Sequence, residues 1–210
     1  MCKNRLEYQL RRQSGTTVNY LFHLFLSGDD PEIITGNFMG DFVKGQLGDD
    51  HPPRLRRGIE LHRRIDSFAR DQEHFNRSRL RLGPEFGLYR GILVDLYYDH
   101  FLAVNWSQWS REPLTVYLDR VRLLVEEQRA RLPERLQEMV PLIFEDLLPS
   151  YREPAGIGRA LERMGRRVKR ENPLAGGGAE LVRHYDGLQQ DFHGFLPAVQ
   201  AFAARFIESG

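Results

Sequence analysis

Histidine and aspartate side chains recur in short segments of this chain, and they are the groups best placed to do chemistry. In Leu61–Asp66, His62 and Asp66 are four residues apart, so on a helix they project from one face. In Asp95–Leu102, Asp95 and Asp99 share a face and His100 follows one step round the helix. The apolar flanks of this segment imply burial, where two carboxylates repel each other and are costly to desolvate unless they share a cation. The pattern therefore indicates a metal ion.

Two further residues extend this set. Asp41 lies between aromatic residues and glycines in the segment 36–45, and His23 lies inside the apolar run 20–26. Imidazole and carboxylate groups drawn from several helices predict a divalent-metal site suited to Mn²⁺, Fe or Mg²⁺ rather than to thiolate zinc. Such an ion activates water and polarises a phosphoryl oxygen, so the residues favour metal-assisted hydrolysis of a phosphoester.

Each of these residues also has a purely structural interpretation. His23 is compatible with a hydrogen-bonded core histidine, His62 and Asp66 with a surface pair, and Asp41 with a helix cap or turn. The sequence contains no GxSxG, P-loop, HExxH or dinucleotide-binding motif. The single cysteine, Cys2, excludes an internal disulfide and makes a thiol nucleophile improbable. The Asp95, Asp99 and His100 triplet is the hardest to explain without a cation.

The elements that must position these residues are predicted to be helices. Apolar residues recur at steps of three and four in 114–132 and in 180–195, and the segment 92–102 is apolar nearly all round. No alternating pattern of useful length predicts a strand. We therefore expect an all-α fold: a compact multi-helix single domain with a central metal site.

The length and composition fit one globular domain. The chain has 210 residues, of which 41% are hydrophobic and 28% charged, which excludes wholesale disorder. Residues 1–17 are polar and show no sustained apolar period, so they predict a flexible N-terminal extension, with the helical domain spanning 18–210. No apolar run approaches the roughly 20 residues of a membrane span, and no secretory signal is present. A cytoplasmic protein without a membrane partner is expected.

Charge is balanced over the chain but uneven along it. The net charge of +1 excludes a polycation, yet residues 54–81 carry nine basic and four acidic residues, a net of 9 − 4 = +5. Residues 159–170 carry six basic and one acidic residue, 6 − 1 = +5. These segments are interpreted either as solvated helix faces or as a basic rim that attracts an anionic partner. No nucleic-acid-binding motif supports a nucleic acid as that partner.

Several motifs occur in an order typical of one family. They are Val18-Asn19-Tyr20-Leu21-Phe22-His23-Leu24, Gly36-Asn37 with Gly40-Asp41-Phe42-Val43-Lys44-Gly45, Gly58-Ile59-Glu60-Leu61-His62-Arg63-Arg64-Ile65-Asp66, Asp95 with Asp99-His100-Phe101-Leu102, and His184-Tyr185-Asp186. From Val18 to about Phe202 the chain resembles the acyl carrier protein phosphodiesterases, a helical family related to the HD-type metal phosphohydrolases.

The resemblance implies an activity and a set of roles. The enzyme would hydrolyse the phosphodiester that joins 4′-phosphopantetheine to a serine of holo-acyl carrier protein, an acidic protein, with Mn²⁺ as the metal. His23, Asp41, His62 and Asp99 are then expected as metal ligands. Asp66, Asp95 and His100 are expected as further ligands or as groups that orient imidazoles and accept a proton. Arg63 and Arg64 are expected to grip the phosphate.

The chain departs from the family pattern at three places. Phe25 and Glu60 stand where members commonly have histidines, and Ala69-Arg70 stands where Thr-Asp is usual. These departures leave two alternatives open: a metal phosphohydrolase that acts on a small phosphoester, and a non-catalytic helical module that docks an acidic partner. The sequence does not indicate an oligomeric state.

Overall fold

Helices form all the regular secondary structure of residues 19–209, the part of the chain that the computed structural model describes. The elements are α2 (Tyr20–Phe25), α3 (Pro31–Phe38), η1 (Gly40–Phe42), α4 (Pro53–Asp71), α5 (Glu73–Arg81), η2 (Pro84–Tyr89), α6 (Arg90–Val104), α7 (Trp106–Trp109), α8 (Leu114–Glu127), η3 (Arg129–Arg131), α9 (Glu134–Leu142), η4 (Ile143–Leu147), α10 (Leu148–Ser150), α11 (Pro154–Arg167), η5 (Leu174–Gly176), α12 (Gly177–Arg183) and α13 (Tyr185–Glu208). The predicted all-α fold is confirmed. The extension predicted over 1–17, with its boundary at residue 18, lies outside the described residues.

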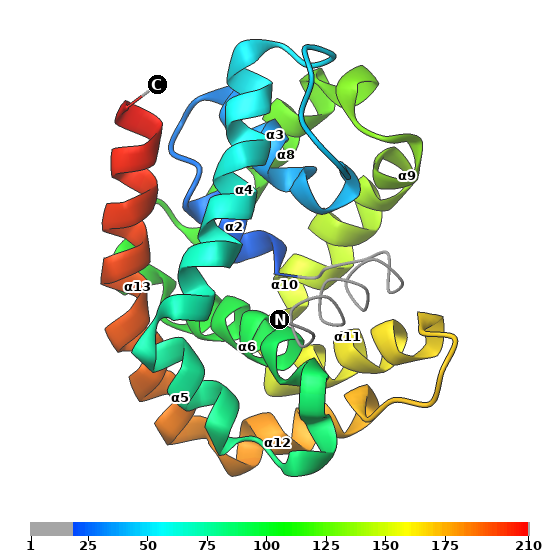
Figure 1. Ribbon diagram of the computed structural model, residues 1–210, viewed down its shortest axis with the longest axis vertical. Helices are drawn as coiled ribbons and strands as arrows, with labels where there is room; N and C mark the ends of the chain where they lie inside the picture. Colours follow the sequence, from blue (N-terminus) through cyan, green and yellow to red (C-terminus); the bar gives the residue numbers. More distant parts are fainter. Residues whose placement is uncertain (1–18, 210) are drawn as a thin grey trace.

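Helix α6 forms the centre of the core. It crosses the middle of the molecule, while α13 runs along one edge and α11 and α12 lie at one end (Figure 1). Leu93, Leu96, Tyr97 and Phe101 of α6 are fully buried. The prediction of a buried central helix over 92–102 is therefore confirmed, and its polar residues must find partners inside the protein.

Helices α3 and α4 pack side by side at unusually close range (Figure 1). A Cβ atom added to Gly36 of α3 would lie 2.1 Å from the carbonyl oxygen of Leu55, and one added to Gly58 of α4 would lie 2.3 Å from that of Ile33. No side chain fits between the two backbones, so glycine is required at both positions. This close approach carries His62 of α4 to the backbone of Asn37 in α3.

The late helices differ from the predicted periods. The stretch 180–195 is divided at His184, where α12 ends and α13 begins. Gly177 and Gly178 open α12, and Gly177 packs closely against α11, since an added Cβ there would lie 2.6 Å from Leu161. Pro197 lies inside α13. The spacing of apolar residues does not reveal a single non-helical residue, here His184, between two helices that face the same core.

Among residues 19–209, no helix combines the length and apolarity that crossing a membrane requires. The cytoplasmic location stays a prediction.

Candidate metal centre

Two histidine rings from different helices are stacked inside the protein. The rings of His23 in α2 and His62 in α4 have their centroids 3.9 Å apart and their planes inclined by 18°. Both side chains are buried. Gly40 makes room for this pair, because a Cβ added there would lie 2.3 Å from Cγ of His62. The sequence singled out both histidines but gave no sign that their rings touch.

Asn37 of α3 fixes the orientation of both imidazoles. Its side-chain oxygen lies 2.9 Å from Nδ1 of His23, and its backbone oxygen lies 2.9 Å from Nδ1 of His62. The Asn37 amide nitrogen donates to the His23 carbonyl oxygen and to Ser27 Oγ, each at 2.9 Å, which sets its oxygen toward the His23 ring. Both Nδ1 atoms therefore donate, and each neutral ring presents the lone pair of Nε2.

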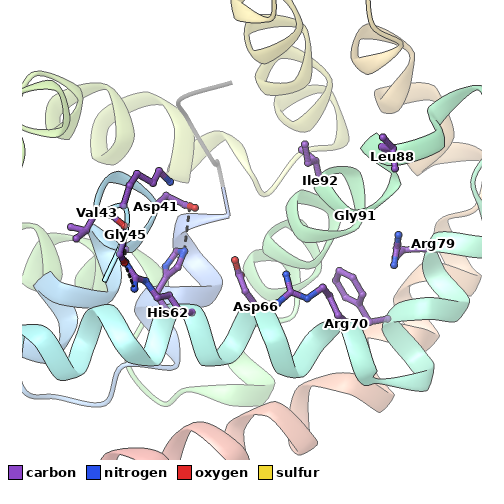
Figure 2. A pocket seen from close by; sticks show the side chains of 14 residues that line it. Asp41, Val43, Gly45, His62, Asp66, Arg70, Arg79, Leu88, Gly91 and Ile92 are labelled. Carbon is purple, nitrogen blue, oxygen red and sulfur yellow. Dashed lines mark hydrogen bonds and ion pairs between the residues drawn. The ribbon is translucent and has the colours of Figure 1, made fainter. Parts of the chain in front are cut away.

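Two carboxylates lie beside these Nε2 atoms. Asp66 Oδ1 is 3.5 Å from Nε2 of His23, and Asp41 Oδ2 is 3.4 Å from Nε2 of His62. Figure 2 shows the His62 ring turned toward Asp41, with Asp66 next along α4. One ligand atom each from His23, His62 and Asp66 lies within 4.8 Å of the others.

This donor set fits a divalent cation. Nε2 of His62 is buried, and it forms no hydrogen bond with any described residue although it faces a carboxylate. Ring nitrogens oriented through Nδ1, together with carboxylate oxygens, make up a common ligand set for a transition-metal ion. A deprotonated Nε2 that faces a carboxylate is unfavourable because both atoms are acceptors, and a proton or a cation bound between them removes the cost.

Burial and neighbouring charges lower the pKa of His23 and raise the pKa of His62. Burial lowers the pKa of His23, and the neighbouring His62 lowers it further. Burial also lowers the pKa of His62, but the Asp41 and Asp66 carboxylates outweigh it and raise the pKa above its ordinary value. His62 therefore keeps its second proton to a higher pH than His23 does, and it must lose that proton to bind a metal ion.

A pocket of about 290 Å³ opens beside this cluster. Figure 2 shows its length, from Asp41 and His62 at one end, past Asp66, to Leu88, Gly91 and Ile92 at the other. Its charged lining residues are two acids and four cations: Asp41, Asp66, Lys44, Arg63, Arg70 and Arg79. The excess of positive charge suits an anionic ligand.

The two arginines expected to grip a phosphate are placed differently. Arg63 lines the pocket, where its guanidinium donates to the carbonyl oxygens of Gly45 at 2.9 Å and Val43 at 3.0 Å and so holds the loop beside the cluster. Arg64 is exposed and is not among the pocket residues. The structure thus gives Arg63 a loop-holding contact that sequence spacing does not suggest.

The residues predicted on α6 do not join the cluster of His23, His62 and Asp66. Asp95 lies nearest, in a second small pocket that His23 and Asp66 also line. Both carboxylate oxygens of Asp99 accept bonds from the first turn of α2, from Leu21 N at 3.2 Å and Phe22 N at 2.8 Å. Burial raises the pKa of Asp99 well above its usual value, against the effect of those amides. Asp99 is therefore placed as a cap for α2.

His100 also points elsewhere. Its Nδ1 lies 2.7 Å from the carbonyl oxygen of Tyr151, and its Nε2 lies 3.0 Å from the Tyr185 hydroxyl. Both ring nitrogens thus have protein partners, which leaves no lone pair for a metal or a substrate. The sequence placed His100 near Asp95 and Asp99 correctly, but the neighbouring position on a helix is rotated by about 100°.

Sequence reasoning missed Asn37, Lys44, Arg70 and Arg79 as residues of the site. Asn37 and Lys44 occur in a segment chosen for Asp41, and nothing in their type or spacing marks them. Arg70 appeared only as a departure from the family pattern, yet it lines the pocket one helical turn after Asp66. The other two departures, Phe25 and Glu60, lie outside both pockets.

Comparison with known proteins points to one family. Residues 18–199 match the family described as acyl carrier protein phosphodiesterase. Among curated proteins, the chain is 30% identical over 188 residues to an acyl carrier protein phosphodiesterase of Pectobacterium atrosepticum, covering 89% of this chain and 97% of that protein. It is 32% identical over 197 residues to a protein of the same name from Salmonella paratyphi A, covering 90% and 98%. No solved structure matches the chain.

Proposed function

The chain belongs to the acyl carrier protein phosphodiesterase family, and we propose that it hydrolyses the phosphodiester between 4′-phosphopantetheine and a serine of holo-acyl carrier protein. Apo-carrier protein and free phosphopantetheine are the products. One observation carries the chemistry: two oriented imidazoles and two carboxylates lie together, and His62, Asp41 and Asp66 of this group line one end of a cation-lined pocket.

His23, His62 and Asp66 would hold the metal ion, with Asp41 beside His62. A mixed set of nitrogen and oxygen donors without thiolate suits Mn²⁺, with Fe or Mg²⁺ as alternatives. When bound, such an ion polarises a phosphoryl group and makes water a stronger nucleophile. Asp95 is the remaining predicted group near this site, since it lines the small pocket on the His23 side of Asp66.

The protein groups divide the remaining work. Asn37 keeps both imidazoles in the tautomer that exposes Nε2. Asp41, whose side chain is 14% exposed, lies where a proton from the attacking water can be accepted. Lys44 and Arg70 line the pocket and offset the charge of the phosphodiester.

The substrate protein is acidic, and the two basic segments, 54–81 and 159–170, would attract it. The two segments differ in how many of their cations are exposed. In the first segment, Arg77 and Arg81 are paired with the buried Asp191, and Arg64 and Arg70 are exposed at the surface. In the second segment, Arg166 and Lys169 are exposed. An acidic protein would be drawn to these surfaces with a strength that falls as salt rises.

Incubation of the full-length protein with holo-acyl carrier protein and Mn²⁺ tests the proposal. Intact-protein mass spectrometry should show the carrier losing the mass of its prosthetic group, and chelation should stop the loss. A complete time course without mass change, under conditions where metal is bound, would contradict the proposal. Turnover of small phosphodiesters alone would point to the small-substrate alternative, and carrier binding without metal uptake to the non-catalytic module.

A further inference from the structure

The pocket beside the metal cluster has a second end that the hydrolysis itself does not require. Leu88 and Ile92 line this end, and Gly91 lies between them in the chain (Figure 2). We propose that it is the subsite for the pantetheine arm, so that the arm, which keeps the phosphate, lies toward α6 and the leaving serine of the carrier protein lies beside the loop 43–45. This assignment rests on the proposed function and fixes the direction of the substrate in the pocket.

This end of the pocket is lined by apolar side chains, and cationic side chains lie close to them. Phe75 is 4% exposed and Ile92 8% exposed, so the little surface they keep borders the pocket. Arg70 lies next to Asp66 on the way to this end, and Arg79 lies at this end on the Leu88 side (Figure 2). Phosphopantetheine has a matching order of groups: a phosphate, then a carbon that bears two methyl groups, then two amides. With the phosphate near Asp66 and Arg70, the methyl groups would reach the apolar end.

The opposite direction offers too little room. On the His23 side of Asp66, the second pocket has a volume of only about 10 Å³. Such a space holds at most about one water molecule, and pantetheine is many times larger. At the other end of the main pocket, the loop 43–45 is half-exposed or exposed, which suits the surface of an incoming protein better than a narrow arm. The end toward α6 is therefore the better match for the arm.

Gly91 offers a way to fill this subsite without disturbing the fold. A Cβ atom added to Gly91 would meet no described atom within 4 Å, and its backbone is that of helix α6. Leucine favours a helix more than glycine does, so Gly91→Leu should keep or raise the thermal midpoint. The added side chain should occupy the space that the arm needs.

The test measures binding to the full-length Mn²⁺-loaded protein by calorimetry, with 4′-phosphopantetheine and inorganic phosphate as probes. Gly91→Leu should weaken phosphopantetheine binding by about tenfold or more and leave phosphate binding unchanged. Unchanged phosphopantetheine affinity in a folded Gly91→Leu would overturn the proposal. Because no turnover is needed, this outcome is separate from failure of the wild type to release apo-carrier protein, which would contradict the proposed function.

A second pair of variants guards against a folding defect. Leu88 is half-buried in the pocket lining, whereas Leu80 is 76% exposed and lies outside it. Leu88→Glu should raise KM for holo-carrier protein by about tenfold, and it should raise KM for a small aryl phosphodiester, which has no arm, by much less. Leu80→Glu should change neither. Equal effects of the two variants, or an equal loss on both substrates, would reject the arm subsite.

Discussion

Two buried polar clusters in this protein differ in whether their hydrogen bonds are complete. In one, the fully buried Asp191 of α13 accepts from Arg77 at Oδ1, and its Oδ2 accepts from Arg81 Nε at 2.8 Å and from Ser78 Oγ at 3.1 Å. In the other, the imidazoles of His23 and His62 have fixed Nδ1 atoms, but Nε2 of His62 has no hydrogen bond among the described residues.

The difference separates structure from function. A satisfied cluster ties helices together, as Asp191 ties α13 to α5, and needs nothing further. An incomplete cluster held in place by oriented partners has an unfavourable free energy until a ligand completes it. Two buried histidines show the same contrast. His100, outside the site, has hydrogen-bond partners at both ring nitrogens, whereas His62, inside the site, has one among the described residues only at Nδ1. Substitutions should therefore affect stability in one cluster and chemistry in the other.

The largest effect is expected from replacing His62, whose Nε2 faces Asp41 without forming a hydrogen bond to any described residue. His62→Gln should lower kcat/KM for holo-carrier protein by more than about 100-fold, since even the loss of an outer group that orients a ligand costs 10–100-fold in metal affinity or activity. Bound Mn²⁺, measured by elemental analysis after dialysis, should fall in parallel. The thermal midpoint without metal should change little.

His100→Gln is the matched substitution. It removes bonds to Tyr151 and Tyr185, so it should lower the midpoint and leave metal content and activity of the folded protein near wild type. If His100→Gln abolished activity while metal and fold were retained, the contrast between the two histidines would be wrong, and the sequence-based expectation of a catalytic His100 would stand.

The next effect is on stability in the satisfied cluster. Asp191→Asn leaves two arginines facing a neutral group, and breaking a buried pair costs about 3–5 kcal/mol. Because the Arg77 and Arg81 side chains are 40% and 32% exposed, they can turn to water, and about 2–3 kcal/mol is expected. Denaturant unfolding measures the loss, and kcat of the remaining folded enzyme should be unchanged. A stable but inactive Asp191→Asn would place Asp191 in the chemistry instead.

A smaller effect is expected at Asn37, which orients the two imidazoles without itself binding the metal ion. Asn37→Leu removes the oxygen that fixes His23 but keeps the backbone oxygen that fixes His62. Mn²⁺ affinity, measured by calorimetry, should fall by about 10–100-fold. Thr35→Val, at an equally buried position of α3 whose hydroxyl bonds only to Pro31 of its own helix, should leave that affinity intact. Equal losses in the two variants would mean that Asn37 acts through helix stability.

Much of this arrangement could be predicted from the sequence, and the rest could not for physical reasons. Helical periods and the apolar stretch 92–102 report burial directly, so the fold class and the central helix followed from them. His23 was singled out because a polar residue inside an apolar run needs a partner, and His62 with Asp66 because a spacing of four places both on one helix face. Asp41 was singled out because it lies between aromatic residues and glycines. Asn37 was missed because one of its two contacts is made by a backbone oxygen, which every residue has.

The residues on α6 show where spacing misleads. Asp95, Asp99 and His100 are close in sequence, yet they face a small pocket, the first turn of α2 and the α13 side respectively. A carboxylate in an apolar helix signals burial with a partner, but the partner of Asp99 is a pair of backbone amides and not a cation. Only the packing of α2 against α6 distinguishes these cases.

The smallest effect concerns pH and depends on the raised pKa of His62. In the metal-free protein, a histidine with a raised folded-state pKa adds stability that is complete below its unfolded pKa of about 6.5 and is lost as pH rises through the folded value. With Mn²⁺ bound the sign reverses, because protons compete with the metal for the ring, so the metal's stabilisation should grow as pH rises through the same range. Thermal midpoints from pH 6 to pH 8, with and without Mn²⁺, should therefore diverge as pH rises. His62→Gln should remove this divergence, whereas Asp191→Asn should lower both curves and keep it. Parallel curves in the wild type would show that His62 does not exchange its proton for the metal, and the incomplete cluster would then have to be completed by something other than a cation.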